Sequence, residues 1–598
     1  MRHSLHSAAA LLCLLAGLVS AIPSALAQGA SNFTPEWVER SNAIAQEVLT
    51  MSAQFAPEFS GQLGVDGFDD EIFDLKPNLH ERQQAVGEQQ LAYLEGQLKQ
   101  EEDPRVIQDI EIMLKAMRDQ MHSQQVEYEH QLPYGSLPML IFAGFNGLLD
   151  KQVPLERQQA ALVRLKKYTG QAEGYVPLVE LARDRLTERM AEPDLIPPFV
   201  GEVKQDVERA PTLIAGLTSL FQNTELEGWE DDVALLSEQL TEYNGWVEET
   251  IVPVARPSAA LPRELYELAL TNYGVDDTPE QLIRTGQVAF TNIRNEMMAL
   301  APLVAAEKGW ETNDYREVIA LLKKEQVPGD QLMAAYEDVM ARLDEIIARE
   351  KLVSLPDEPA RVRMATPAET AQQPAAHLDV PRLIGNTGEH PEFIVPDIPR
   401  NEDGSWPMSD YAFPAQMWTL SAHEARPGHE MQFTTMLRGG VSTARALFAF
   451  NSANVEGWAL YAEAISKPYM PLEGQLLSLQ GRLLRAARIW LDPMLNLDLI
   501  SADEAKRVLM EDVCEDALNA QTEVDRYTFR SPGQATAYYY GYENLQALRA
   551  QTELRLKDAF DQQAYHDFIL AQGLLPPDVL RQAVEQNFIA PRLQAAGL

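Results

Sequence analysis

Apolar residues recur three or four positions apart through most of the chain between Thr34 and Lys351. This spacing places them along one side of an α-helix, the side that packs against other helices. Proline-containing breaks separate the stretches, as at Leu195-Ile196-Pro197-Pro198 and from Val252-Pro253 to Leu261-Pro262. The pattern therefore predicts a mainly α fold. The clearest predicted helical stretches are Ala85–Leu98, Val106–Met121, Gln158–Leu181 and Gln281–Leu303.

The segment between Val353 and Pro414 has a different character. Pro, Gly, Asn and Asp are dense there, and Ala360–Met364 and Glu392–Val395 have the composition of short strands. Helical periodicity returns from Ala415 onward. We therefore expect an N-terminal helical region over residues 28–352 that serves as scaffold and cleft wall, a loop-rich and β-rich connector over residues 353–414, and a C-terminal helical region over residues 415–598 that carries the reactive residues.

The first residues have the pattern of a signal peptide. Arg2 supplies a positive charge, Ala8–Val19 is almost wholly apolar, and Ala25-Leu26-Ala27 is a small-x-small cleavage site. The apolar run is too short for a stable membrane span. We expect cleavage after Ala27 and a periplasmic or secreted protein without a stable membrane anchor, the alternative being an uncleaved N-terminal anchor. Cys13 would leave with the peptide, so Cys514 would remain alone and no internal disulfide could form.

The net charge of the chain indicates which classes of partner it is not expected to bind. Its 598 residues include 89 acidic and 49 basic side chains, which gives a formal net charge of −40. Such a charge repels the phosphate backbone of nucleic acids and anionic lipid headgroups. We therefore expect neither nucleic acid nor a membrane surface as a partner. The same charge also suits a protein that only has to stay soluble, so it does not identify a substrate.

Two histidines stand six positions apart in the segment Ser421–Gln432, which reads SAHEARPGHEMQ. Zinc hydrolases often carry His-Glu-x-x-His on one helix, where the histidines share a face and the glutamate activates a bound water. That spacing fails here because Pro427 stands four positions after His423. On an unbroken helix, residues six apart point about 120° away from one another. A shared metal ion therefore requires a break in the helix.

The same segment contains residues that break a helix. Pro427 lacks the amide hydrogen that would bond the carbonyl of His423, and it disfavours helical angles at Arg426. Gly428 tolerates positive φ. A break between Glu424 and His429 could bring both imidazoles to one face. Isolated His-Glu pairs are common, so this motif alone is also compatible with a purely structural role.

A later segment, Asn454–Glu463, offers the third ligand that such a site needs. Glu456 and Glu463 stand seven positions apart and so project from one face of a helix. Glu456 is the better ligand candidate, and Glu463 could hold a ligand histidine in position. Two glutamates alone would also fit a solvated helix face. The residues expected to face the core are Val455, Trp458, Ala462 and Ile465.

Several blocks of the C-terminal region recur together in one known family. They are His423-Glu-Ala-Arg-Pro-Gly-His429 with Gln432, then Glu456-Gly-Trp-Ala-Leu-Tyr-Ala-Glu463, then Glu523-Val-Asp-Arg-Tyr527 followed by Pro532-Gly-Gln-Ala535, Tyr538 and Gly541, and the tail Tyr565-His-Asp-Phe-Ile-Leu with Gly573 and Pro576. In these blocks the chain resembles the bacterial family catalogued as domain of unknown function 885 (DUF885). That family is generally grouped with the zincin metallopeptidases of the gluzincin type.

The resemblance implies a large helical zincin-like fold, with the small β-rich and loop-rich segment beside a central cleft that accepts short peptides. It implies one Zn²⁺ ion bound by His423, His429 and Glu456, with Glu424 as the general base. Related zincins stabilise the oxyanion with a tyrosine or histidine from the C-terminal part of the domain.

By the same resemblance, Tyr538 and Tyr527 become candidates for the oxyanion role, and Gln534 for a contact with the substrate backbone. Tyrosines crowd this part of the sequence, and simple packing is the alternative for any one of them. Arg526 could bind a peptide carboxylate, or it could form an ion pair with Glu523 or Asp525.

One block departs from the family pattern. The Arg485–Asn496 region resembles a block that often ends Asp-Thr-Gly-x-His, but here it ends Asp492-Pro-Met-Leu-Asn496. If that histidine binds substrate in the family, the specificity of this chain differs.

Other chemistries lack their motifs. The chain has neither a Gly-x-Ser-x-Gly nucleophile elbow nor a glycine-rich phosphate loop. Cys514, in the stretch Glu511–Glu515 that we expect to be helical, is surrounded by acidic residues that disfavour a thiolate. We therefore predict an exported zinc-dependent hydrolase, a peptidase that cleaves short peptides through a zinc-activated water with Glu424 as general base. The alternatives are a non-catalytic peptide-binding protein on the same scaffold, and a metal-dependent hydrolase of a non-peptide amide or ester. The sequence leaves the oligomeric state open.

Overall fold

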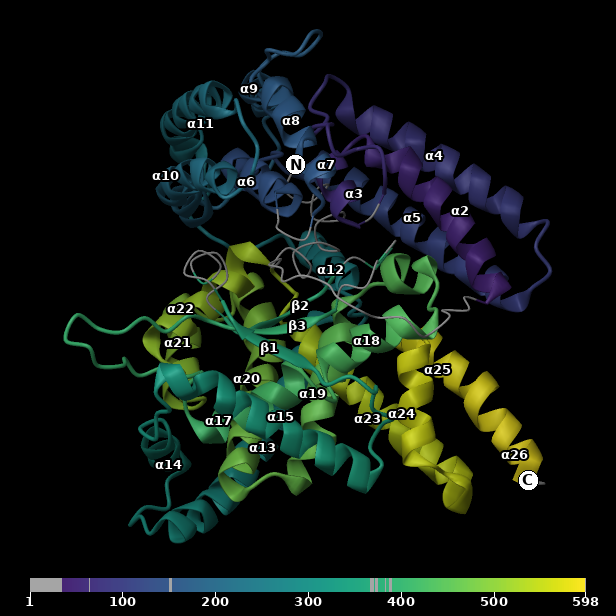
Figure 1. Cartoon of the computed structure of the whole chain (residues 1–598), viewed down its shortest axis with the longest axis vertical. Coiled ribbons are helices and arrows are strands. Elements are labelled where there is room, and N and C mark those ends of the chain that lie inside the picture. The colour runs from purple at the N-terminus through teal and green to yellow at the C-terminus, as the bar shows by residue number, and fades with distance from the viewer. Residues whose placement is uncertain are drawn as a thin grey trace. The chain divides into compact units, whose positions relative to one another are not determined.

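The computed structural model describes residues 35–596 apart from 64, 150–152, 366–369, 371–374, 382, 385 and 387–389. The predicted signal peptide, residues 1–27, lies outside this part of the chain. Helices make up most of the described residues, which confirms the mainly α fold (Figure 1). The chain divides into two units, and their boundary at Ala259 and Ala260 falls ahead of the change in composition at Val353.

Unit 1 comprises the residues up to Ala259 together with Pro381–Glu389 and Ser442–Phe448. Its core is formed by aromatic and aliphatic side chains such as Phe145 and Phe221, whose rings lie 5.2 Å apart edge to face. The helices of unit 1 are α2 (Glu36–Ala53), α3 (Pro57–Leu63), α4 (Leu79–Leu98), α5 (Pro104–His130), α6 (Leu137–Leu148), α7 (Leu155–Gln158), α8 (Ala160–Tyr168), α9 (Leu178–Met190), α10 (Val200–Gln222), α11 (Glu230–Thr250), the short η1 (Val252–Val254) and the π-helical turn η3 (Ala444–Phe448).

Three of the four predicted helical stretches are confirmed, in α4, α5 and α13. The fourth, Gln158–Leu181, is not one helix, because α8 ends at Tyr168 and α9 begins only at Leu178. Gly170 and Gly174 between them adopt φ angles of 76° and 82°, which end a helix. The apolar periodicity continues across this turn because both flanking helices bury residues in the same core.

Unit 2 comprises Ala260–Val380, His390–Val441 and Ala449–Leu598. Its helices are α12 (Arg263–Asn272), α13 (Pro279–Lys308), α14 (Tyr315–Leu322), η2 (Gly329–Gln331), α15 (Leu332–Glu350), α17 (Pro414–Glu424), α18 (His429–Gly439), α19 (Ser452–Ser466), η4 (Lys467–Tyr469), α20 (Leu472–Asn496), α21 (Ala502–Glu511), α22 (Ala517–Asp525), the π-helical turn η5 (Arg526–Arg530), α23 (Thr536–Leu556), η6 (Lys557–Ala559), α24 (Gln562–Ala571), α25 (Pro577–Ala583), the π-helical turn η7 (Val584–Ile589) and α26 (Ala590–Ala596).

A small sheet interrupts the helices of unit 2. The two predicted strands are confirmed as β1 (Arg361–Met364) and β3 (Glu392–Val395), and β2 (His377–Asp379) joins them. The strand order is β1-β3-β2, with β1 parallel and β2 antiparallel to β3. Phe393 at the centre of β3 is fully buried, and its ring meets that of Tyr336 on α15 edge to face at 5.4 Å. The sheet therefore packs on α15.

The segment Ser442–Phe448 lies in the sequence between α18 and α19 but belongs to unit 1. Arg445 donates through Nε to Oδ1 of the fully buried Asp109 at 2.8 Å, and Ser41 donates to the other oxygen of Asp109 at 2.6 Å. Ala444 is buried in the core formed by α2, α4 and α5. The segment is thus fixed by both an ion pair and apolar packing.

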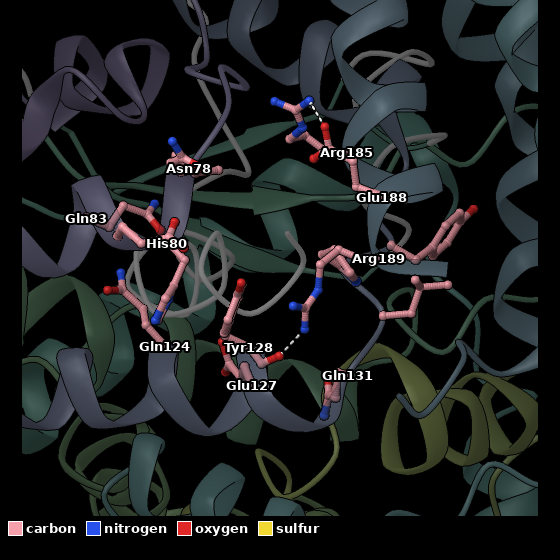
Figure 2. Close-up of a pocket in the computed structure, with 15 residues that line it drawn as sticks. Asn78, His80, Gln83, Gln124, Glu127, Tyr128, Gln131, Arg185, Glu188 and Arg189 are labelled. Atoms are coloured by element: carbon pink, nitrogen blue, oxygen red, sulfur yellow. Dashed lines mark hydrogen bonds and ion pairs between the residues drawn. The ribbon is translucent and has the colours of Figure 1, made fainter. Parts of the chain in front are cut away.

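Unit 1 also contains a pocket of its own, between α4, α5 and α9 (Figure 2). The ring of Tyr128 stacks on that of His80 at 4.0 Å, and the guanidinium of Arg189 lies 4.0 Å from the Tyr128 ring. Arg189 also binds Glu192, and Arg185 binds Glu188. Both arginines are therefore already neutralised by glutamates of unit 1.

Two further observations concern membrane-spanning helices and the thiol of Cys514. Among the residues described, no helix has the length and apolar character needed to cross a membrane. Cys514 lies beyond the end of α21 with a φ of 72°, so the expected helix over Glu511–Glu515 is wrong. Burial raises the pKa of the Cys514 thiol to about 12, which leaves it protonated at neutral pH.

Candidate metal centre

The helix that carries His423 breaks immediately after Glu424, as the sequence predicts. Helix α17 ends at Glu424, the Arg426–Pro427 peptide is cis, and α18 begins at His429. Gly428 adopts φ −79° and ψ −131°, so its role is not the positive φ that we expected. Glycine is required there for space, because a Cβ at this position would lie 1.9 Å from the carbonyl oxygen of His423.

The break is held in place by a tryptophan from a neighbouring helix. Trp458 on α19 donates from Nε1 to the carbonyl oxygens of Pro427 at 2.9 Å and Gly428 at 3.3 Å. The Gly428 carbonyl also accepts from the backbone amide of Gln432 at 3.1 Å in the first turn of α18, whereas the indole satisfies the Pro427 carbonyl within the break. Trp458 is only 1% exposed. The side chain expected to face the core thus also fixes the backbone between the two histidines.

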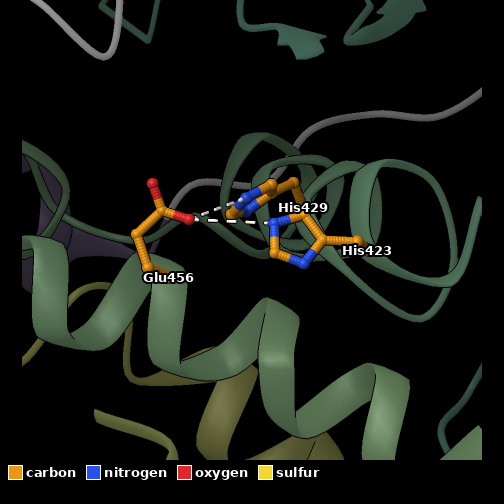
Figure 3. Close-up of side chains that lie close together, drawn as sticks. All are labelled: His423, His429 and Glu456. Carbon is orange, nitrogen blue, oxygen red and sulfur yellow. Dashed lines mark ion pairs between the residues drawn. The ribbon is translucent and has the colours of Figure 1, made fainter. Parts of the chain in front are cut away.

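The break brings His423, His429 and Glu456 together, as Figure 3 shows. Nε2 of His429 lies 3.5 Å and Nε2 of His423 lies 3.8 Å from Oε2 of Glu456. Four ligands placed tetrahedrally around zinc at about 2.0–2.1 Å stand about 3.4 Å apart. All three side chains are buried. Two imidazoles and one carboxylate at these separations therefore fit a zinc ion, with one position left open.

Glu463 orients His423, as predicted. Its Oε1 lies 2.7 Å from Nδ1 of His423, and its Oε2 accepts a hydrogen bond from Thr419 at 2.6 Å. A carboxylate can only accept, so Nδ1 carries the proton and the lone pair of the neutral ring is on Nε2, which faces Glu456. His429 lacks such a partner, because its buried Nδ1 has none among the described residues.

The electrostatics of the centre favour a cation. Burial alone would lower the pKa of His423, but hydrogen bonding to Glu456 and Glu463 and the charge of Glu424 raise it to about 9. Burial would raise the pKa of Glu456, but the two histidines hold it well below its usual range. The buried carboxylates thus retain negative charge and attract either protons on the imidazoles or a metal ion in their place.

Glu424, the predicted base, lies at the edge of this group. Its Oε1 is 4.0 Å from Nε2 of His423, and its side chain is 10% exposed. Glu430, in the first turn of α18, is occupied by Arg426, which donates to it from Nε at 2.6 Å. Within the described part of the chain, no arginine or lysine forms an ion pair with Glu424, unlike Glu430.

Two glycines bring Tyr538 beside Glu456. A Cβ on Gly457 of α19 would lie 2.6 Å from the Cα of Gly541, and a Cβ on Gly541 of α23 would lie 1.8 Å from the carbonyl oxygen of Ala453. The two backbones therefore touch. Tyr538 stands one turn before Gly541, and the charge of Glu456 contributes to the raised pKa of its hydroxyl, which burial raises most.

The other predicted residues form a connected group around Tyr538. Arg526 donates from Nη2 to the Tyr538 hydroxyl at 2.9 Å and also binds the side-chain oxygen of Gln534. Gln534 lies 3.5 Å from the hydroxyl of Ser452, one turn before Glu456 on α19. Arg526 also lies 3.5 Å from Glu523, which is one of the two ion pairs considered for it.

Tyr527 takes a different place from Tyr538. It is fully buried, and its hydroxyl donates to Oε2 of Glu523 at 2.7 Å. Burial, together with the Glu523 charge, raises its pKa well above the usual value. Its hydroxyl is already used by Glu523, whereas the hydroxyl of Tyr538 is the one on which the charge of Glu456 acts.

Sequence reasoning missed several residues of the site. Thr419, Arg485 and Arg488 all contact side chains that were predicted. The two arginines stand three positions apart on α20. The sequence pattern that could have revealed them is the recurrence of arginine on one face of a leucine-rich helix. Asn496, where the DUF885 block often has histidine, donates to the carboxylate of Asp492 at 3.1 Å and to the Tyr527 carbonyl at 2.9 Å.

Comparisons with known proteins place the chain among bacterial proteins of undetermined role. The family described as "Bacterial protein of unknown function (DUF885)" matches residues 57–584. A candidate lipoprotein of unknown function from Shewanella oneidensis has a similar solved structure, with a TM-score of 0.73 at 20% identity, covering 92% of this chain and all of that one. A candidate lipoprotein from Colwellia psychrerythraea has a TM-score of 0.74 at 16% identity, covering 92% and 98%. No curated protein sequence matches the chain.

Proposed function

The chain belongs to the DUF885 family, whose function is unknown, so its chemistry has to be inferred from its own side chains, and we propose that it is an exported, zinc-dependent hydrolase that cleaves short peptides. The observation that carries the proposal is the convergence of His423, His429 and Glu456 at 3.5 and 3.8 Å. Two nitrogen donors and one carboxylate with an open fourth position are the ligand set of catalytic rather than structural zinc sites.

His423, His429 and Glu456 would hold the zinc ion, which would supply Lewis-acid chemistry that polarises a substrate carbonyl and acidifies a water molecule. Glu424 takes the proton of the attacking water and returns it to the leaving nitrogen. Glu463 keeps His423 in the tautomer that presents Nε2, and its charge increases the basicity of that ligand. The Tyr538 hydroxyl, next to Glu456, donates to the oxygen on which negative charge develops.

The choice of a peptide substrate rests on the resemblance of the motif blocks to zincin-like metallopeptidases. The choice of an exported protein rests on the pattern of residues 1–27 and on the two solved neighbours, both described as candidate lipoproteins. The alternatives remain a non-catalytic peptide-binding protein and a metal-dependent hydrolase of a non-peptide amide or ester. Each has its own outcome in the experiment that follows.

The test compares the mature chain, residues 28–598, with its Glu424→Gln variant. We expect about one zinc per chain by mass spectrometry of the metal in both proteins, because Glu424 is not a ligand. Hydrolysis of a mixed library of short peptides should fall by roughly 100- to 10,000-fold in the variant, the range that a general base contributes. The matched control is Glu511→Gln, an exposed glutamate on α21 that pairs with the exposed Arg507.

Near-zero metal in the purified chain, or full activity of Glu424→Gln, contradicts the proposal. Peptide binding without hydrolysis by the zinc-loaded wild type would favour the binding protein. Hydrolysis of esters or small amides but of no peptide would favour the other hydrolase.

A further inference from the structure

Three arginines surround the ring of Tyr538. The guanidinium carbons of Arg485 and Arg488 on α20 and of Arg526 in η5 lie 5.8, 4.6 and 5.2 Å from the centre of the ring. We call these three residues the arginine cluster. Cations at such distances are attracted to the face of an aromatic ring. In a chain with a net charge of −40, three guanidinium groups around one side chain are an unusual concentration of positive charge.

The carboxylates that pair with the arginine cluster carry less negative charge than the cluster carries positive charge. Arg488 binds both oxygens of Glu523, at 2.7 and 2.8 Å, and Arg526 shares the same carboxylate at 3.5 Å. Arg485 lies 3.8 Å from Glu463, whose charge is already used by His423. Within the described part of the chain these are the carboxylates that ion-pair with the cluster. Three cations thus share two anions, one of which also serves a histidine.

The members of the arginine cluster differ in how far they are available. Arg488 is 8% exposed at its side chain and is held by two hydrogen bonds to Glu523. The side chains of Arg485 and Arg526 are 17% and 23% exposed. Among the described residues, Nε of Arg485 has no hydrogen-bonding partner. Arg485 and Arg526 are therefore the two members that could receive a further anion.

The position of the cluster limits where that anion would come from. Tyr538, at its centre, lies on α23, which touches α19, and the charge of Glu456 on α19 acts on its hydroxyl. Arg485 adjoins Glu463, which holds His423. The cluster therefore borders the proposed metal centre at two carboxylates of that centre, Glu456 and Glu463. A molecule bound at the proposed centre is therefore the candidate source of the anion.

We propose that Arg485 and Arg526 bind a carboxylate of the substrate, one or two residues from the bond that is cleaved. The proposal rests on the hydrolase function proposed above and adds its substrate class, short peptides with a negative charge near the scissile bond. The planar guanidinium group matches a carboxylate in geometry, and such charge-assisted hydrogen bonds exceed neutral ones in strength. The carboxylate could be the free C-terminus of the peptide or the side chain of Asp or Glu.

Three peptides of one length separate the two sources. They are N-acetyl tetra-alanine with a free C-terminus, its C-terminal amide, and the amide with Asp as the last residue. We expect kcat/KM for the free acid to exceed that for the amide by roughly 10- to 100-fold, mainly through KM, because one charge-assisted interaction is lost. If Asp restores cleavage of the amide, a side-chain carboxylate is accepted as well. Equal cleavage of all three overturns the proposal.

Variants connect the effect to the cluster. Arg485→Gln should raise KM for the acid but not for the neutral amide, and Arg485→Lys should recover part of the loss. The matched control is Arg342→Gln, an exposed arginine of α15 that pairs with Asp338. If both Arg485→Gln and Arg526→Gln still cleave the free acid better than the amide, as the wild type does, these two residues do not bind the carboxylate.

A binding measurement keeps this inference separate from the hydrolase proposal. Titration of dialanine and of dialanine amide into zinc-loaded Glu424→Gln protein should show tighter binding of the free acid, without any need for turnover. Tighter binding of the acid supports the inference even if no peptide is hydrolysed. Zinc and peptidase activity together with equal binding of acid and amide would overturn the inference and leave the hydrolase proposal standing.

Discussion

At the scale of single residues, Glu463 is the side chain that holds His423, one of the three proposed metal ligands. It accepts from Nδ1 of His423 at 2.7 Å and from Thr419 at 2.6 Å. Replacing it by glutamine keeps the shape and an acceptor for Nδ1 but removes the charge. We expect the zinc affinity of Glu463→Gln to fall about 10- to 100-fold, because the imidazole becomes a weaker donor.

Competition with a fluorescent zinc chelator measures this affinity directly. Glu511→Gln, which removes a charge from the surface, serves as the matched control. An unchanged affinity in Glu463→Gln would mean that the contact only packs α19 against α17.

The same residues show what sequence can and cannot predict. The seven-residue spacing of Glu456 and Glu463 predicted that one would be a ligand candidate and the other would hold a histidine, and the contact of Glu463 with His423 is found. Pro427 predicted the helix break. The reason for Gly428 could not be predicted, because it depends on a carbonyl that reaches the position only after the chain has bent.

At the scale of elements, the contact between α19 and α23 depends on two positions without side chains. A methyl group on Gly541 would lie 1.8 Å from the carbonyl oxygen of Ala453, which is backbone and cannot rotate away. We expect Gly541→Ala to lower the free energy of unfolding by about 2–3 kcal/mol or more, because the helices must separate. Zinc affinity should fall as well, since Glu456 is carried on α19.

Gly245→Ala is the matched control, since it makes the same substitution within α11, where nothing lies within 4 Å of the added carbon. Alanine is favoured in a free helix position, so that variant should be neutral or more stable by up to about 1 kcal/mol. Urea denaturation of both variants measures the difference. Equal stability of the two would show that α19 and α23 can adjust to a methyl group.

Elements were predicted where periodicity alone decides them. The predicted helical stretches within α4, α5 and α13 and the strands β1 and β3 are confirmed, because each buries one side along its length. The error over Gln158–Leu181 has a physical cause, since a turn with two glycines kept the apolar spacing in phase. The strand β2 has three residues and owes its existence to pairing with β3, which no local pattern records.

At the scale of the whole molecule, the response to acid includes a contribution from His566 on α24. Its Nδ1 donates to the carbonyl oxygen of Leu352 at 2.5 Å, and its Nε2 accepts from Tyr461 at 2.8 Å. Burial lowers its pKa to about 4 from the ordinary 6.5, although the Leu352 carbonyl opposes this shift. In the unfolded chain the ring takes up a proton near pH 6.5, and in the folded chain only near pH 4.

The sign follows from that difference. Between pH 6.5 and 4 the unfolded chain binds the proton and the folded chain does not, so acidification favours unfolding. Above pH 6.5 the neutral His566 makes its full contribution to the free energy of unfolding, about 3 kcal/mol. This contribution is lost as the pH falls toward 4. Urea denaturation at several pH values should therefore show a shallower pH dependence for His566→Gln than for wild type. A wild-type slope in His566→Gln would contradict the expectation.

The packing of helices that are far apart in the sequence was the hardest feature to predict. The order of helical and loop-rich regions could be read from composition, and the candidate ligands were proposed from their motifs and the family resemblance. The assignment of α12 to α15 to the same unit as the proposed metal centre could not, because it depends on packing between residues far apart in the chain. Nor could the arginine cluster, whose members come from α20 and η5 and meet only around Tyr538.

The short segment Ser442–Phe448 has a consequence for how such a protein can be divided. It is encoded between the helix that begins with His429 and the helix that carries Glu456, yet its Arg445 neutralises Asp109 of unit 1. A gene cut after Ala259 would leave this arginine without its carboxylate and Asp109 without its cation. Neither the piece before that cut nor the piece after it would then hold a complete unit 1.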